Sequence, residues 1–233
     1  QTARTLWQGQ ADWTLRPQSG DWTPQSPTGQ VIFDTLSAHI HPAQACAALV
    51  AALRAHGVEV QTDGASAGPT LWATGIAGLE ALNRPDARPM GAGVKGQAAL
   101  LAYDAAGLPQ LYADTLHIIP HLDGTVAVGS TSENTYAHNT PDTLLEDVIA
   151  RARAAVPVLR GAPVVARWAG IRPRARSRAP MLGAWPDRPG HYIANGGFKI
   201  GFGMAPKVAE TMADLILEGR DTIPPGFEVA ASV

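Results

Sequence analysis

Apolar residues at helical spacing predict four helices. The first covers residues 40–57, with His41 at the N-cap position and Pro42 at the first helical position. Its apolar positions fall on one face, with Cys46 adjoining them (Leu49, Val50 and Leu53). The other helices are expected over residues 76–83, 140–155 and 206–218.

Alternating apolar and polar residues predict short strands between these helices. Residues 97–104, 110–122 and 125–133 are strand-like runs, and Ala106-Gly107 and Asp123-Gly124 between them favour hairpin turns. Further strands are expected over residues 58–60, 69–75, 162–172 and 191–195. An antiparallel meander combined with strand–glycine–helix units predicts a mixed α/β (α+β) fold with two interleaved subdomains.

The composition is that of a folded protein. The chain has 233 residues, of which 45% are apolar and 16% charged, and this balance argues against disorder. Its net charge of −2 selects neither nucleic acid nor an anionic membrane as a partner. The single cysteine, Cys46, excludes an internal disulfide and fits a reducing compartment. No apolar run approaches the roughly 18–20 residues of a membrane span, so we expect a cytoplasmic protein.

Residues 91–96, Gly91-Ala-Gly-Val-Lys-Gly96, have the G-x-G-x-x-G spacing of a dinucleotide-binding turn. Such a turn functions only between a strand and a helix, whose N-terminus meets the pyrophosphate. Here the following run leads into strands, and no acidic residue ends a second strand about 20 positions later. We therefore interpret this spacing as coincidental.

Four arginines alternate along one stretch, Arg172, Arg174, Arg176 and Arg178. If the stretch is extended, its period of two places these side chains on one face. Guanidinium groups bind carboxylates and phosphates, so an anionic substrate or cofactor is one interpretation. A charged edge strand that resists aggregation is the other. Arg172 is the strongest candidate, because it lies nearest the apolar strand, where an isolated charge needs a partner.

Residues 196–206 begin with a glycine-rich turn, Gly196-Gly-Phe-Lys-Ile-Gly-Phe-Gly203, between a strand and a helix. Its exposed N–H groups and the helix dipole suit a partial negative charge, such as the carbonyl region of a reduced flavin. Lys199 adds a full positive charge within the turn. A tight strand-to-helix connection without a ligand is the alternative.

The seven histidines offer little sign of a metal site. His39 and His41 lie two residues apart, and His117 and His121 lie four apart in a strand-like run. No cluster of carboxylates or thiols accompanies either pair, so no metal site is expected. A serine hydrolase is also not expected, because Gly-x-Ser-x-Gly is absent.

Five stretches form a recognisable series. They are His41-Pro42 with its helix to Gly57; Leu71-Trp-Ala-Thr-Gly75; Lys95-Gly-Gln97; His117-Ile-Ile-Pro120 with Gly124 and Gly129-Ser-Thr131; and Gly170-Ile-Arg-Pro173 through Ala179-Pro-Met-Leu-Gly183, joined to Gly196 through Pro206. In this order they resemble the D-amino-acid oxidase superfamily, particularly its glycine oxidase and sarcosine oxidase-like members. The resemblance covers most of the chain from about Ser37 onward.

The resemblance implies an FAD-binding Rossmann-like domain, incomplete here, interleaved with a substrate domain on an antiparallel or mixed sheet. The implied activity is oxidation of the C–N bond of a small amine or amino acid to an imine, with hydride transfer to the flavin. The implied substrate domain comprises residues 1–36 and 90–165. The implied FAD-binding domain comprises residues 37–89 and 166–233.

The resemblance also implies site residues. Arg172 is expected to clamp the substrate carboxylate, and His117 and Lys199 are further catalytic candidates. The expected FAD contacts are Gly75, Gly196, Gly197, Phe198, Lys199, Ile200 and Gly201. The expected partner is a small-molecule amine or amino acid, and neither a membrane nor a nucleic acid is expected.

Three positions depart from the family's pattern. His117 stands where the glycine-oxidase branch favours Tyr, and Lys199 stands where it favours Arg. Ser177 stands where many relatives have Asp. His117 can still hydrogen-bond a carboxylate, but Lys199 lacks the bidentate fork of Arg. Specificity for glycine therefore does not follow from the resemblance.

Relatives begin with a strand–GxGxxG–helix segment, and none precedes Trp7, so we expect an upstream segment that holds the FAD diphosphate. Two alternative functions remain open. One is a tRNA-modifying flavin domain whose arginines contact phosphates. The other is a degenerate, cofactor-free relative that acts as an anion-binding or interaction module.

Overall fold

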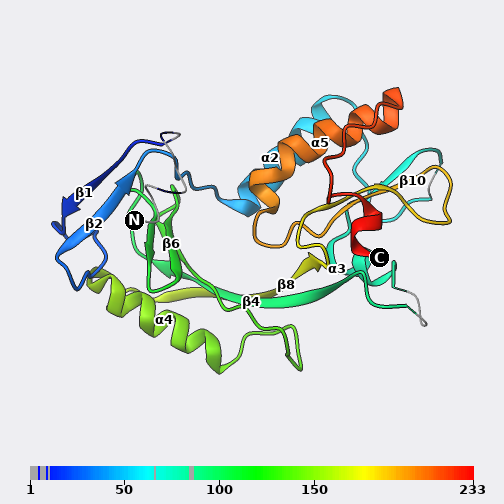
Figure 1. Cartoon of the computed structure of the whole chain (residues 1–233). Coiled ribbons are helices and arrows are strands. Elements are labelled where there is room, and N and C mark those ends of the chain that lie inside the picture. The colour runs from blue at the N-terminus through cyan, green and yellow to red at the C-terminus, as the bar shows by residue number, and fades with distance from the viewer. Residues whose placement is uncertain (1–4, 6–8, 10, 66, 84–86) are drawn as a thin grey trace. The chain divides into compact units, whose positions relative to one another are not determined.

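The chain folds into two compact units whose segments alternate along the sequence (Figure 1). The computed structural model describes all residues except 1–4, 6–8, 10, 66 and 84–86. Unit 1 comprises Gln1–Val60, Gln97–Thr131 and Thr140–Ala169, and unit 2 comprises Gln61–Gly96, Ser132–Asn139 and Gly170–Val233. The mixed α/β class and the interleaving predicted from the sequence are confirmed.

The predicted domains have different bounds from these two units. Residues 37–60 fall in unit 1, whereas the sequence assigns residues 37–89 to the FAD-binding domain. The units are defined by packing alone, and the predicted domains are defined by what they bind. The assignment of domains to FAD and to substrate therefore stays a prediction.

Unit 1 is built mainly on antiparallel strands. A separate hairpin pairs β1 (Trp13–Pro17) with β2 (Gln30–Asp34). A larger sheet has the order β5-β6-β7-β4-β8, and its long strands β4 and β8 contribute residues to both units. The bounds of its strands are Leu111–Ala113 for β5, Leu116–Pro120 for β6, Thr125–Gly129 for β7, Gly91–Ala102 for β4 and Val164–Ala175 for β8.

Helix α4 (Thr143–Ala155) covers β6 and β7 and completes the core of unit 1 (Figure 1). It begins at Asp142, whose side chain caps the Leu144 amide. A short 3-10 helix, Pro157–Leu159, follows it. Apolar side chains from the helix and from alternate strand positions meet in this core, among them Leu101, Ile118, Val126, Val128, Leu145, Ile149 and Leu159.

Unit 2 contains a three-stranded mixed sheet with the order β3-β10-β9. The central strand β10 (His191–Asn195) pairs in parallel with β3 (Thr70–Trp72) and antiparallel with β9 (Met181–Ala184). Helix α3 (Gly75–Glu80) follows β3, and a 3-10 helix, Val229–Ser232, lies against β9. Its core is a second, smaller cluster that includes Leu79, Leu82, Met90, Met181, Trp185 and Ile193.

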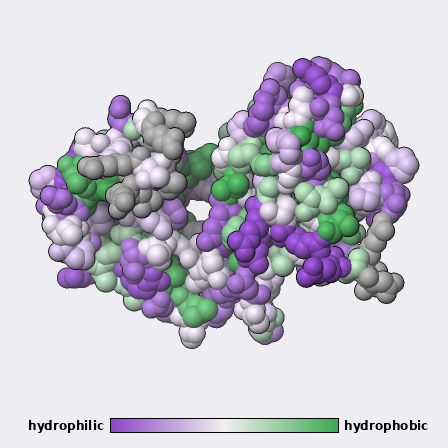
Figure 2. All heavy atoms as spheres, viewed as in Figure 1, coloured by the Kyte–Doolittle hydropathy of each residue, from purple (hydrophilic) through white to green (hydrophobic). Residues whose placement is uncertain are grey.

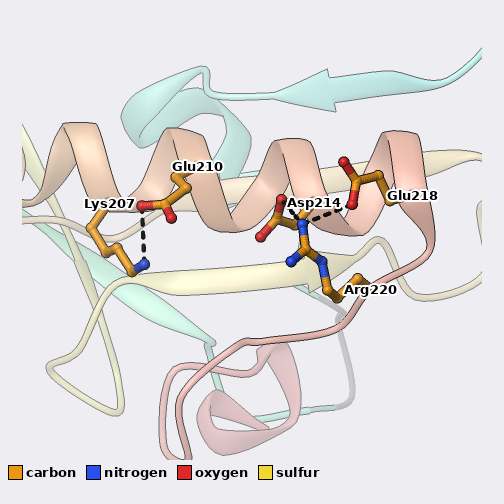
Figure 3. A network of polar contacts seen from close by, with 5 residues as sticks. All are labelled: Lys207, Glu210, Asp214, Glu218 and Arg220. Atoms are coloured by element: carbon orange, nitrogen blue, oxygen red, sulfur yellow. Dashed lines mark hydrogen bonds and ion pairs between the residues drawn. The ribbon is translucent and has the colours of Figure 1, made fainter.

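Helix α5 (Gly201–Glu218) ends at a left-handed glycine and a cluster of charges. Gly219 has φ of 66°, the left-handed conformation common at helix ends, and the Arg220 amide donates to the Asp214 carbonyl. The Arg220 guanidinium also contacts the carboxylates of Asp214 and Glu218, both at 2.7 Å, while Lys207 pairs with Glu210 at 3.0 Å (Figure 3). Hydrophilic side chains gather at this end of the helix (Figure 2). Exposed pairs of this kind contribute little stability.

Helix α2 (Pro42–Ala55) has the predicted start, and its residues are not buried. The His41 side chain accepts a hydrogen bond from the Gln44 amide, and Pro42 occupies the first turn, as expected. None of its residues is buried, however: Leu49 is 63% exposed and Leu53 is 46% exposed. The apolar side chains Leu49 and Leu53 of this helix are therefore exposed.

Several predicted bounds also change. Residues 110–122 form two strands, not one, and residues 58–60 form none. The α4 helix begins at Thr143 instead of at residue 140, and α5 begins at Gly201, five residues before Pro206. Strand β9 was not predicted. The G-x-G-x-x-G residues 91–96 lie within β4, which confirms that they form no strand-to-helix turn.

Candidate active site

Two parallel strands of unit 2 end at the same edge of their sheet. Strands β3 and β10 pair in parallel, with Trp72 opposite Ile193. The turns that follow the carboxyl ends of neighbouring parallel strands lie side by side, and this is where α/β sheets bind ligands. Gly75 follows β3, and Gly196 follows β10 directly. The fold therefore brings together the two turns that the sequence predicts as cofactor contacts.

A buried asparagine joins these two turns. Asn195 is 8% exposed, and its side-chain N–H donates to the Gly75 carbonyl at 2.7 Å. Its side-chain oxygen accepts from the Gly196 amide, also at 2.7 Å. Both ends of the buried amide are thus satisfied, as burial requires. Sequence reasoning missed Asn195, although a polar residue that ends an apolar strand just before two glycines is a usable signal.

The glycine-rich turn is also fixed to the end of β8. The Phe198 amide donates to the Pro173 carbonyl at 3.0 Å, and Arg174 forms an antiparallel bridge with Gly197. Gly196 has φ of 74°, and a Cβ on it would lie 2.7 Å from the Cβ of Ala175. Only glycine fits there, because both the backbone conformation and the neighbouring strand exclude a side chain.

The turn presents positive charge and leads directly into the start of a helix. The Arg174 guanidinium and the Lys199 ammonium lie 5.6 Å and 5.5 Å from the centre of the Phe198 ring. Helix α5 begins at Gly201, with no acidic residue in its first turn. The first amides of a helix have no partner within the helix and carry the positive end of its dipole. This arrangement suits an anionic or carbonyl oxygen.

Arg172 lies across a glycine of the neighbouring strand. A Cβ on Gly96 would lie 2.0 Å from Nη1 of Arg172 and 2.2 Å from Cζ and Nη2, so the guanidinium occupies the space of a missing side chain. Burial lowers the pKa of Arg172, and the carboxylate of Glu133 acts in the opposite direction. A guanidinium remains charged despite such a shift.

A buried ion pair adjoins Arg172. Nζ of Lys95 lies 3.5 Å from a carboxylate oxygen of Glu133, and the two side chains are only 2% and 12% exposed. The three groups together carry two positive charges and one negative charge. Their net charge favours an anionic ligand such as a carboxylate. Lys95 lies in one of the stretches that carry the resemblance, but Glu133 was not predicted.

All three glycines of the G-x-G-x-x-G spacing meet neighbouring groups at close range. A Cβ on Gly91 would lie 2.4 Å from the Arg174 carbonyl oxygen, and one on Gly93 would lie 2.6 Å from the Tyr136 hydroxyl. The third is Gly96, which accommodates the Arg172 guanidinium. These glycines therefore allow close approach to β8 and its neighbours, and no nucleotide is needed to explain them.

The four arginines do not form a single row. Strand β8 ends at Ala175, and Arg178 lies in a turn with φ of 66°. Arg174, Arg176 and Arg178 line a pocket of about 290 Å³, whereas Arg172 is not among its lining residues. Nη1 of Arg176 is buried without a hydrogen-bond partner among the described residues. The stretch is extended only as far as Ala175, so the condition for placing all four arginines on one face is not met.

The sequence matches a known protein family over most of its length. The family described as FAD dependent oxidoreductase (DAO) matches residues 3–215. The chain belongs to this family. Glycine oxidase of Pseudomonas putida is 35% identical over 134 residues, which are 57% of this chain and 37% of that protein. Glycine oxidase of Bacillus subtilis is 32% identical over 126 residues, or 53% of this chain and 34% of that protein. The chain thus spans little more than a third of the length of these relatives.

Solved structures of DAO-type enzymes share the fold. Glycine oxidase from Geobacillus kaustophilus superposes with a TM-score of 0.54 and 25% identity, over 60% of this chain and 39% of that one. Iminodiacetate oxidase from Chelativorans has 16% identity, but its TM-score is 0.77 over 95% of this chain and 68% of that one. The predicted resemblance is confirmed, and FAD is the cofactor that the family description names.

His117 belongs to a different unit from the other catalytic candidates. It belongs to β6 in unit 1, whereas Arg172 and Lys199 belong to unit 2. Its exposed ring contacts that of Tyr112, with 4.9 Å between the ring centres. The contacts that the structure gives for His117 lie within unit 1, so they do not test its catalytic role, which stays a prediction.

The histidines pair differently from the sequence expectation. His41 contacts His121, with 4.1 Å between the ring centres, and Asp123 lies beside both. Burial is the main cause that lowers the pKa of His121, and a hydrogen bond from the Thr125 hydroxyl is the main cause that lowers the pKa of Asp123. The expectation that no carboxylate accompanies these histidines is therefore wrong for His41 and His121.

Among the described residues, no helix is long and apolar enough to cross a membrane.

Proposed function

We propose that this chain belongs to an FAD-dependent oxidoreductase that oxidises the C–N bond of a small amine or amino acid to an imine. Arg172 binds the substrate carboxylate, and the turn from Gly196 to Gly201 contacts the flavin. When bound, FAD supplies the hydride acceptor for this oxidation. Membership of the DAO family and the similarity to glycine oxidases support the reaction class.

The observation that carries the proposal is the strand end from Arg172 to Ala175. It holds the Arg172 guanidinium across Gly96, and one residue later the Pro173 carbonyl fixes the glycine-rich turn. A carboxylate contact and a cofactor contact thus come from one rigid element. Precise relative placement of such contacts requires rigid support of this kind.

The residues have separate roles in this proposal. Arg172 orients the substrate by a bidentate contact with its carboxylate, while Lys95 balances the charge of Glu133, so that the Arg172 charge is left for the substrate. The amides at the start of α5 and the Lys199 ammonium stabilise negative charge on the flavin carbonyl edge. Gly75 contributes a neighbouring turn that Asn195 holds in place. His117 is a further candidate for hydrogen bonding the substrate carboxylate.

The test is Arg172→Leu in the FAD-loaded protein. A bidentate carboxylate contact in a partly buried site contributes about 2–4 kcal/mol, or roughly 30- to 1000-fold in kcat/KM. We expect KM for amino-acid substrates to rise strongly while the flavin stays bound, and simple amines without a carboxylate to be affected far less. Arg167→Leu is the matched control, because Arg167 forms an exposed pair with Glu146 in unit 1.

Equal losses for amino acids and amines, or loss of flavin, would assign Arg172 to structure or to cofactor binding. The tRNA alternative is favoured by one observation: three arginines are among the residues that line the pocket. Binding of tRNA that falls steeply with salt and is lost in Arg176→Leu would favour that alternative. Visible flavin absorbance in the purified protein would exclude the cofactor-free alternative.

A further inference from the structure

Three potential metal ligands converge in unit 1. His41 precedes α2, His121 follows β6, and Asp123 lies in the turn between β6 and β7. One ligand atom from each lies within 4.8 Å of the other two. Nε2 of His41 is 3.6 Å from Oδ2 of Asp123. Ligands of a tetrahedral zinc ion lie about 3.3–3.5 Å apart, given bonds of about 2.0–2.1 Å. The His41–Asp123 pair is therefore close to this spacing already, and the other two pairs lie within 4.8 Å.

One threonine orients two of the three ligands. The Thr125 hydroxyl lies 3.1 Å from Nδ1 of His121 and donates to Oδ1 of Asp123 at 2.7 Å. The Thr125 amide donates to the same carboxylate oxygen at 3.1 Å. Oδ2 of Asp123 lies toward Nε2 of His41, and Nε2 of His121 takes no part in the contact with Thr125. Metal sites characteristically hold their ligands by outer hydrogen bonds of this type.

Each histidine can present a ring nitrogen without a proton to a metal ion. Nδ1 of His41 now accepts from the Gln44 amide over a long 3.4 Å, so Nε2 carries the imidazole proton. A metal at Nε2 moves this proton to Nδ1, and that weak capping contact is given up. His121 needs no such change if Nδ1 donates to Thr125. His121 is only 6% exposed, so its ring is held by packing as well as by this bond.

We propose that His41, His121 and Asp123 bind a divalent transition-metal ion, with zinc as the best match, and that the ion fastens the start of α2 to the β6–β7 turn. Two imidazoles and one carboxylate suit zinc, and water completes its coordination. The ion is distinct from the flavin chemistry, because all of its ligands lie in unit 1, outside the Arg172 site.

The experiment titrates the purified, tag-free 233-residue chain with Zn²⁺ in a calorimeter, and repeats the titration with Co²⁺ while recording visible absorption. We expect one Zn²⁺ per chain, a higher melting temperature with zinc, and visible Co²⁺ bands that excess zinc removes. His121→Gln and Asp123→Asn should each weaken zinc binding at least tenfold. Thr125→Val keeps every ligand, and should weaken it about 10- to 100-fold through lost orientation.

His56→Gln is the matched control, because it makes the same substitution at an exposed histidine of the same unit. It should bind zinc as the unaltered chain does. Far-UV circular dichroism of the metal-free variants separates loss of ligands from loss of folding, and Asp123→Asn is a conservative change at an exposed turn. Absence of stoichiometric binding by the unaltered chain would overturn the proposal, as would equal zinc affinity in folded His121→Gln and Asp123→Asn.

Discussion

A single methyl group at Gly96 should displace Arg172 without unfolding the protein. In Gly96→Ala the new Cβ would lie 2.0–2.2 Å from three guanidinium atoms, and ordinary contacts begin at 3.4 Å. The guanidinium must therefore move by about 1.2–1.4 Å, from the difference between these distances. It is the end of a flexible side chain, so the shift is inexpensive for folding. In a strand, Ala is also about 0.5–1 kcal/mol more favourable than Gly.

The same shift should be costly for substrate binding. A misplacement of about 1 Å in a positioned group costs about 100-fold, and a hydrogen bond to a charged group contributes about 1.5–3 kcal/mol. We expect kcat/KM for an amino-acid substrate to fall about 10- to 100-fold, mainly through KM. The matching amine without a carboxylate should change by less than about threefold. Steady-state kinetics with both substrates and urea unfolding measure these effects.

Two variants test whether Gly96 affects substrate binding through Arg172. Gly170→Ala places its Cβ in open space two residues from Arg172, so it should leave kinetics and stability unchanged. In Arg172→Leu the obstructed group is gone, so adding Gly96→Ala should cause no further loss in kcat/KM. Additive losses in the double variant, or equal losses for both substrates, would show that Gly96 does not act through Arg172.

Two further substitutions test the framework of the site. Glu133→Gln leaves the buried Lys95 charge poorly compensated and should lower the free energy of unfolding by about 3–5 kcal/mol in a denaturant titration. The control is Glu146→Gln, which breaks an exposed pair and should lower it by less than about 1 kcal/mol. Asn195→Ala removes two buried hydrogen bonds, so it should lower the free energy of unfolding by about 1–3 kcal/mol and weaken flavin retention. Asn139→Ala, at an exposed asparagine, is the control. Unchanged stability and flavin content in Asn195→Ala would show that Asn195 does not support the site.

Local sequence signals predicted the elements whose causes are local. The α2 helix begins where His41 and Pro42 place it, because a cap and a proline act within one turn. The break between β5 and β6 has a distant cause. Asp114 and Thr115 adopt φ of 49° and 63°, and Arg151 of α4 binds both of them. A contact across 36 or 37 positions cannot be read from the pattern of the strand itself.

The residues of the candidate site also divide into those with local sequence signals and those that depend on distant partners. The glycine-rich turn and Arg172 were predicted because their chemistry is concentrated in short stretches. Asn195 and Glu133 were not, since each acts on a partner brought close only by folding: Gly75 is 120 positions from Asn195. Glu133 lies in an ordinary polar segment, and only its isolated bridge to Lys95 shows its importance.

The glycines at 91, 93 and 96 show why a motif needs its structural context. Their spacing is that of a dinucleotide-binding turn, yet all three lie in one strand, β4. In a nucleotide-binding turn, glycine lets the backbone approach a phosphate; here it lets β4 approach the Arg174 carbonyl, the Tyr136 hydroxyl and the Arg172 guanidinium. In both cases glycine is needed because a side chain would block the approach, and the sequence shows only this need. The group that approaches the glycine differs between the two cases, and that group decides the function. At Gly96 that group is Arg172, the arginine proposed to bind the substrate carboxylate.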